Sequence, residues 1–212
     1  NESLDVLRAL LSQEEVSWKG KYYNFESLTV MPRPMTKNGP PIMMAVLDPQ
    51  GIYACTKRGF HIMTTPLSGD NQLMLDQVDG FVRAKSELKD KGKDLTLSLS
   101  RVAYVAKNDS DRKEKLEMAY EYYSRFDNVF TGPGIVNNGM IEILPRKQSI
   151  EELDQSILIC SADEMIDKLS PYKEGGIDRV ILNMNFGANH KDTMDSIQSF
   201  SEKVIPHFST DA

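Results

Sequence analysis

The last quarter of the chain, from Ile157 to Phe208, alternates apolar runs with amphipathic segments, and this alternation most constrains the fold. An apolar run at 157–160 leads into a helical pattern that stops at Gly175-Gly176. The apolar pattern of Arg179–Met184 follows, and then a closing helical pattern that ends at Pro206. Strands that alternate with helices imply parallel pairing with right-handed crossovers. The sequence therefore predicts an α/β protein with a parallel sheet.

The same rhythm begins earlier, at Pro41. Strands are predicted at Ile42–Val46, His61–Thr64 and Leu95–Ala106, and helices at about Pro49–Arg58, 70–90 and Asp109–Phe126. The apolar runs are largely continuous, which is typical of strands in a sheet covered on both faces. We count about four strand–helix units in this part of the chain.

The residues before Pro41 follow a different pattern. Leucines recur at helical spacing in residues 2–13, which predicts an amphipathic helix. The short aromatic segment Trp18–Phe25 predicts a small hairpin or an edge strand, and four prolines between 32 and 41 predict an extended connection.

Two architectures are consistent with this order of elements. An eight-unit barrel needs roughly 250 residues, so about four units make half of one, and the opening helix has no strand before it. We therefore expect the second half of a (β/α)8 TIM-type barrel, or else a small doubly wound sheet. In either case residues 1–212 are expected to form a single α/β domain. The glycine-containing segment 127–155 is expected to be an insertion or a lid.

Composition excludes several classes of function. The net charge of −6 and a pI near 5.2 argue against nucleic acid or an anionic membrane as partner. No apolar run reaches the length of a membrane span. The two cysteines, Cys55 and Cys160, are far apart in apolar contexts, so we expect buried thiols and a cytoplasmic protein. The three histidines have no metal-ligand spacing, and we expect no metal.

Five pieces of the chain, taken in order, resemble the second half of the luciferase-like, flavin-dependent monooxygenases. They are ESLDVLRALL, WKGKYYNFESLTVMPRP, PPIMMAV, RVAYVAKNDSD and the tail with GGIDRVIL and EKVIP. The resemblance covers nearly the whole chain, with 127–155 the least familiar part. It implies a (β/α)8 barrel that binds FMN or a deazaflavin and oxidises a small organic substrate with molecular oxygen. A flavin reductase is a possible partner.

The resemblance also limits which site residues can be assigned. In this family the early strands, which have no counterpart in these 212 residues, supply most contacts to the flavin ring and the usual catalytic groups. We therefore name no catalytic residue and expect the chain by itself to be inactive.

The turn from Val46 to Gly51 is the family's place for the flavin phosphate. The family usually has Ser, and then Thr three residues later, at the start of a helix whose backbone N–H groups also bind the phosphate. This chain has Asp48 and Gly51 at those positions. A carboxylate repels a phosphate, and Asp48 followed by Pro49 is also a good helix cap. We expect Leu47, Asp48 and Gly51 to border the cofactor, with binding weakened or rearranged, or else Asp48 to serve only as a cap.

Other polar residues lie at the expected ends of strands. Thr64 and Thr65 follow the second strand, where barrel sites gather, and are predicted to bind the cofactor, although ordinary turn chemistry explains them equally well. Arg101 either points into a barrel or forms an ion pair with a neighbouring carboxylate. By analogy with the family, the loop 185–190 borders the pocket, although His190 is better explained as a helix-start residue in solvent.

Two hypotheses of different classes follow. The first is part of a flavin-dependent monooxygenase. The alternative is a non-catalytic, degenerate half-barrel used for binding or assembly, favoured by Asp48 and Gly51. Because a half-barrel has two unpaired strand edges, either form is expected to be a homodimer.

Overall fold

The computed structural model describes residues 1–36, 38–69 and 71–209. The chain divides into two compact units, Asn1–Met43 and a second that begins at Met44, and each is described by itself. Within the described ranges, no helix is both long and apolar enough to cross a membrane.

The first unit is a helix followed by a hairpin. It consists of α1 (Glu2–Ser12), β1 (Val16–Lys19) and β2 (Asn24–Leu28), and the two strands pair antiparallel. The carboxylate of Glu2 accepts a hydrogen bond from Trp18 Nε1 at 3.2 Å and further bonds from backbone N–H groups of the hairpin turn, including that of Tyr23 at 3.1 Å. These bonds fix the start of the helix against the hairpin, and they confirm the predicted helix and hairpin.

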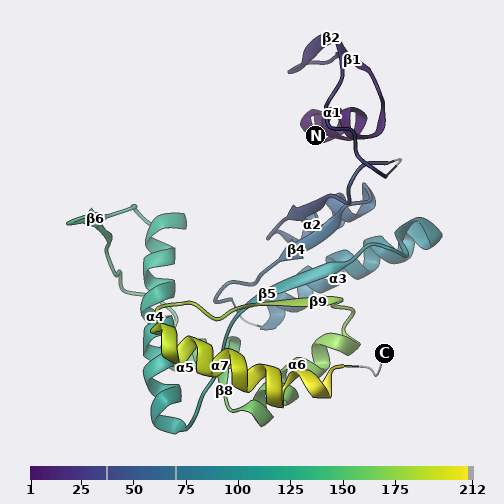
Figure 1. Cartoon of the computed structure of the whole chain (residues 1–212). Helices are drawn as coiled ribbons and strands as arrows, with labels where there is room; N and C mark the ends of the chain where they lie inside the picture. The colour runs from purple at the N-terminus through teal and green to yellow at the C-terminus, as the bar shows by residue number, and fades with distance from the viewer. Residues whose placement is uncertain (37, 70, 210–212) are drawn as a thin grey trace. The chain divides into compact units, whose positions relative to one another are not determined.

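The second unit alternates strands and helices (Figure 1). Its elements are β3 (Met43–Ala45), α2 (Pro49–Lys57), β4 (His61–Thr64), α3 (Asn71–Leu88), η1 (Lys89–Gly92), β5 (Leu97–Val105), α4 (Asp109–Phe130), β6 (Val136–Asn137), β7 (Met140–Ile141), α5 (Ile150–Ser156), β8 (Leu158–Cys160), α6 (Ala162–Glu174), β9 (Arg179–Asn183), α7 (His190–Lys203) and η2 (Ile205–His207).

The sheet is built around β5, its longest strand. The order runs β3-β4-β5, and β5 pairs in parallel with β4, β8 and β9. Asp178, just before β9, fixes the start of this pairing, because its carboxylate accepts from Leu97 N–H at 2.8 Å and its N–H donates to Leu97 C=O at 3.1 Å. The predicted α/β fold with a parallel sheet is confirmed.

Two strands share one edge of β5. Backbone groups of alternate residues point to the same edge of a strand. Thr96 C=O accepts from Ile62 N–H beside β4, and Ala106 N–H donates to Cys160 C=O beside β8. Thr96 and Ala106 are both even-numbered, so their backbone groups point to the same edge of β5, whereas those of the odd-numbered Leu97 point to the edge that faces β9. Along one edge, therefore, β4 pairs with β5 as far as Leu99, and β8 pairs with it from Ala103.

The main core lies on one face of the sheet. There, side chains from β4, β5 and β8 pack against apolar residues of α2, α3 and α6. A second cluster joins the end of β5 to α4 and α5 through Val102, Tyr104, Ala119, Tyr123 and Leu153.

The other sheet face is left largely uncovered beside β3 and β9. Met44 and Val180 pack toward the main core, so their alternating neighbours Ala45 and Ile181 face the opposite way, and both are exposed.

Helix α7 is attached to β5 and α4 by polar contacts. Ser196 Oγ accepts from Val105 N–H at 2.7 Å. Lys115 of α4, whose side chain is 1% exposed, pairs with the Asp192 carboxylate at 3.0 Å, and Lys107 pairs with the same carboxylate at 3.1 Å. Hydrogen bonds from Lys115 and then Lys107 lower the pKa of Asp192 to about 2.

Several sequence predictions need correction. The strand predicted at Ile42–Val46 is not covered on both faces as expected, because Met43 is 39% exposed whereas Met44 packs against the main core. Cys160 is buried, and burial raises the pKa of its thiol to about 11, but Cys55 is only half-buried. Helix α5, inside the predicted insertion, was not anticipated, although Ser149 and Glu152 form the capping box that marks its start.

Candidate functional site

The turn between β3 and α2 is closed by Asp48. Its backbone is extended, with φ −74° and ψ 126°, and its carboxylate accepts from Gly51 N–H at 2.6 Å. Pro49 occupies the first turn, where a missing N–H costs nothing. A Cβ at Gly51 would lie 2.9 Å from Val46 Cγ1 and 3.3 Å from the Asp48 carboxylate. The absence of a side chain at 51 thus allows the carboxylate its position, and the predicted cap is confirmed.

A buried glutamine joins this turn to the loop after β4. Gln77 of α3 is 1% exposed, and its Nε2 donates to Leu47 C=O at 2.8 Å and to Thr65 C=O at 3.1 Å. Leu47 follows β3 and Thr65 follows β4, so both carbonyls lie at the C-terminal ends of neighbouring strands. Gln77 therefore brings together two segments that the sequence placed at the cofactor site, although it had not itself been anticipated. The sequence signal for its burial was its position on the same helix face as Met74, Val78 and Phe81.

The two threonines have different environments. Thr65 Oγ1 accepts from Leu67 N–H at 3.0 Å, which is local turn chemistry at an accessible strand end. Thr64 is 2% exposed and pairs in register with Leu99, whose side chain lies in the main core. Its hydroxyl has no hydrogen-bond partner there. Of the pair, Thr65 is thus the more exposed residue.

The residues of the β3–α2 turn do not fit a phosphate bound by hydroxyl groups. A negative carboxylate already accepts from an N–H at the helix start, and neither position 48 nor position 51 carries a hydroxyl. At about 4 Å each pair of unit charges repels by about 1 kcal/mol in water. A flavin bordering this turn must have its phosphate displaced from the helix axis or bound more weakly.

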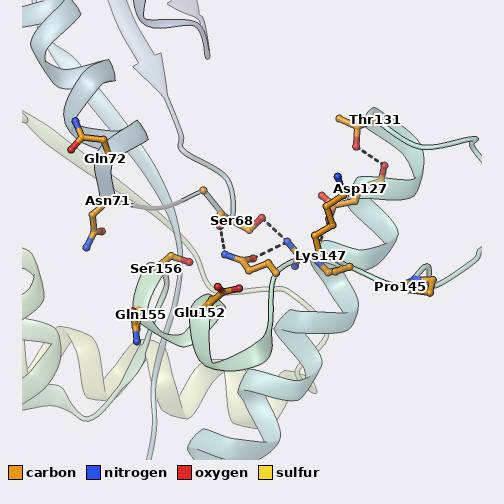
Figure 2. A pocket seen from close by; sticks show the side chains of 13 residues that line it. Ser68, Asn71, Gln72, Asp127, Thr131, Pro145, Lys147, Glu152, Gln155 and Ser156 are labelled. Carbon is orange, nitrogen blue, oxygen red and sulfur yellow. Dashed lines mark hydrogen bonds and ion pairs between the residues drawn. The ribbon is translucent and has the colours of Figure 1, made fainter.

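A cavity of about 900 Å³ lies beside the loop after β4 (Figure 2). Ser68 and Asn71 come from that loop and the start of α3, whereas Asp127 and Thr131 come from the end of α4. The remaining wall is formed by residues 145–156, which include α5. Most of the residues that line the cavity therefore belong to the segment 127–155, which the sequence predicted to be an insertion or lid.

Arg146 attaches that segment to the loop after β4. Its side chain is 4% exposed and pairs with the Asp127 carboxylate at 3.0 Å. Its Nη2 donates to Ser68 Oγ at 2.7 Å, and the guanidinium lies 5.4 Å from the ring centroids of both Tyr120 and Tyr123. The charge of Arg146 is thus compensated by Asp127, so Arg146 connects two segments of the structure and is not a free anion-binding site. Sequence reasoning missed it.

The base of the segment is also well held. Asn128 Nδ2 donates to Ile135 C=O and Glu142 C=O, both at 2.9 Å, and Ser124 Oγ donates to Leu144 C=O. The β6–β7 hairpin projects to one side of the C-terminal end of α4 (Figure 1). Its apolar residues Val136 and Met140 are exposed, at 60% and 65%.

The loop after β9 has a mainly structural organisation. Asn189 caps α7 by accepting from Asp192 N–H at 2.9 Å, and His190 is an exposed residue at the first position of that helix, as predicted. Phe186 is buried edge-to-face against Tyr104, with 6.1 Å between ring centroids. Tyr123 of α4 is buried in the same cluster as these two rings, and Tyr120 and Tyr122 pack against it.

Comparisons with known proteins show relatives of similar sequence and similar fold. The chain is 24% identical over 217 residues to the oxygenase component of flavin-dependent trigonelline monooxygenase from Acinetobacter baylyi, a match that covers 96% of this chain and 60% of that protein. An F420-dependent secondary alcohol dehydrogenase in complex with an F420–acetone adduct superposes with a TM-score of 0.71 at 18% identity, covering 99% of this chain and 61% of that one.

A third similar structure is the oxygenating constituent of 3,6-diketocamphane monooxygenase from Pseudomonas putida, in complex with FMN. Its TM-score is 0.67 at 17% identity, covering 97% of this chain and 62% of that one. The chain thus spans about three-fifths of the length of these relatives. The model of the luciferase-like monooxygenase family matches residues 1–179, and the chain belongs to that family.

Proposed function

We propose that this protein binds a flavin and forms part of a monooxygenase that oxidises a small organic substrate with oxygen and reduced flavin. The observation that carries the proposal is the joining of the two rim segments by Gln77, which holds Leu47 and Thr65 at the ends of β3 and β4. In barrel enzymes of this kind the active site lies at these strand ends.

FMN is the flavin we propose, bordered by Leu47, Asp48, Gly51, Thr64 and Thr65. The FMN complex of a similar fold supports this choice, and the F420-dependent relative supports a deazaflavin as the alternative. The β3–α2 turn does not fit a hydroxyl-bound phosphate, because Asp48 and Gly51 stand where the hydroxyl groups would be needed. A flavin reductase is the proposed partner, since the trigonelline relative is described as an oxygenase component.

The proposed architecture is the second half of a barrel. Helices α2, α3 and α6 cover one sheet face, while Ala45 and Ile181 on the other are exposed. A doubly wound sheet would have helices over both faces along its length, whereas a barrel wall has helices only outside. The family resemblance assigns the missing catalytic groups to the other half.

The second candidate is a non-catalytic half-barrel that dimerises. The Asp48 cap and the uncovered sheet face favour it, because exposed apolar surface and unpaired strand edges promote association. Such a module should be dimeric and should leave flavin unbound.

One experiment separates the two. The protein is titrated with FMN and, separately, with coenzyme F420 while flavin fluorescence is followed, and its mass in solution is measured by light scattering. Saturable binding of either cofactor supports the enzyme. A well-folded dimer that binds neither cofactor supports the assembly module and rejects the first proposal.

A further inference from the structure

Arg101 is a buried cation for which the described residues supply no hydrogen-bond or ion-pair partner. It lies in β5 and is 4% exposed, and its Nε is shielded from solvent with no hydrogen bond. Across residues 1–36, 38–69 and 71–209, no hydrogen bond or ion pair joins Arg101 to another group. The alternative of an ion pair with a neighbouring carboxylate is therefore not supported. In contrast, Arg112 pairs with Asp154 at 2.8 Å.

This isolation is physically unfavourable. A guanidinium stays protonated throughout the accessible pH range, so it cannot avoid the cost of burial by losing its proton. A buried charge is normally retained only where a counter-charge and hydrogen bonds compensate for lost water. The environment of Arg101 therefore calls for an anion that the described residues do not supply.

The strand pairing explains the opening beside Arg101. One edge of β5 pairs with β4 as far as Leu99 and with β8 from Ala103. Arg101 lies between these two stretches, on the face shared with Leu99 and the main core. A pocket of about 430 Å³ opens here between α3 and α6.

The lining of this pocket suits an organic anion. Its walls are mainly apolar, with Met74, Val78, Leu158, Tyr172 and Ile177 among them. Lys168 of α6 is a second cation in the lining, and its Nζ makes a long bond of 3.4 Å to Ile157 C=O. No Asp or Glu is present among the described residues that line it. Two cations facing apolar walls are complementary to a carboxylate attached to an apolar body.

We propose that this pocket, hereafter the Arg101 pocket, binds a small organic carboxylate whose acid group pairs with Arg101 and Lys168. An arginine guanidinium donates two parallel hydrogen bonds to the two oxygens of a carboxylate with good geometry. The volume lies within the range of ordinary small-molecule sites, roughly 300–1,000 Å³. Asn71 and Gln155 line both this pocket and the 900 Å³ cavity, so the two are adjacent. The proposal goes beyond flavin binding and does not depend on it.

The test compares a carboxylate with its uncharged counterpart. The intact protein is titrated with 4-phenylbutanoate and, separately, with 4-phenylbutanamide by isothermal calorimetry. The carboxylate is expected to bind at least about tenfold more tightly, because only it compensates the guanidinium. Equal affinities, or no binding of the acid, would overturn the proposal.

Substitutions locate the site. Arg101→Met replaces the cation with an unbranched apolar side chain and should weaken carboxylate binding at least about tenfold. Lys168→Met should weaken it by a smaller factor. Arg83→Met, on the exposed part of α3, is the matched control and should bind as the wild type does. Wild-type affinity in both Arg101→Met and Lys168→Met would overturn the assignment.

Thermal stability distinguishes a binding role from a structural one. Since Arg101 is uncompensated, Arg101→Met should melt at the same temperature as the ligand-free wild type or higher, and 4-phenylbutanoate should no longer raise its melting point. A lower melting point together with unchanged carboxylate binding would show a purely structural arginine. If Arg101→Met does not fold, Lys168→Met and the amide comparison decide the question by the same criteria.

Discussion

The substitution Asp48→Asn tests the placement of the flavin phosphate, because it removes a charge and keeps a helix cap. The Asp48 carboxylate accepts from Gly51 N–H at 2.6 Å, and the side-chain oxygen of asparagine can accept the same bond. Asn and Asp are nearly equivalent at this helix position. The free energy of unfolding should therefore change little, while the local negative charge disappears.

The expected gain in affinity follows from the exposure of the site. Asp48 is exposed, so the dielectric near it is close to that of water. Each pair of unit charges about 4 Å apart then repels by about 1 kcal/mol, and a phosphate carries about 1.5 to 2 charges. Removing the carboxylate should stabilise the FMN complex by about 1.5–2 kcal/mol, or about 10- to 30-fold in affinity at low salt. Salt screening should reduce this gain.

Fluorescence titrations with FMN and with riboflavin provide the assay. Riboflavin lacks the phosphate, so Asp48→Asn should leave its affinity unchanged. Asp48→Ala is the second variant; it removes the charge but also the cap, and should lower the free energy of unfolding by about 0.5–2 kcal/mol. If Asp48→Asn alters FMN and riboflavin binding equally, or neither, the phosphate does not approach this turn and the assignment is refuted.

Three further substitutions test the site and its support. Gln77→Leu should lower the free energy of unfolding by about 1–3 kcal/mol in urea titrations, because it removes two hydrogen bonds made by a buried side chain. Arg146→Met should speed amide exchange in the segment 127–155 and destabilise the protein by about 1–3 kcal/mol, since it breaks the bond to Ser68. Asp192→Asn should flatten the acid limb of the stability curve in melts across pH. The folded pKa of Asp192, about 2, lies below its ordinary value, so its contribution is complete above the ordinary pKa and is lost as pH falls toward 2.

Each of these has a result that would contradict it. Wild-type stability of Gln77→Leu would mean that water or another donor serves the two carbonyls. Exchange in Arg146→Met that is unchanged over 127–155 would show that the segment is held by other contacts, such as those of Asn128. An unaltered acid limb in Asp192→Asn would place the acid sensitivity elsewhere.

The main elements could be predicted because local signals and burial agree there. Residues 61–64 were identified with the bounds that the structure has, since an apolar run of strand length follows a helix stopped at Gly59. The cap at Asp48 was also predictable, because an Asp-Pro pair starts a helix by local hydrogen bonding alone.

The contacts that shape the site could not be read from local patterns. Gln77 bonds to carbonyls 30 and 12 residues away, and Arg146 bonds to Ser68 across 78 residues. Such pairs depend on how the strands are placed side by side. The isolation of Arg101 likewise follows from a gap between β4 and β8 along one edge of β5, which no sequence period records.

The exposure of β3 has a similar cause. A short, continuous apolar run such as Ile42–Val46 predicts a strand that is buried on both faces. In the structure only Met44 packs inward, and Ala45 faces the uncovered side of the sheet. Which faces are covered depends on the placement of neighbouring elements, and this is decided by tertiary packing.

Flavin content tests the central claim most directly. The protein is purified from its own gene, equilibrated with FMN, separated from free cofactor, and examined for visible flavin absorbance together with its intact mass. We predict flavin bound in stoichiometric proportion, and less of it when Gln77→Leu disturbs the rim. A folded protein that emerges colourless, and equally so with F420, would contradict the flavin-binding account.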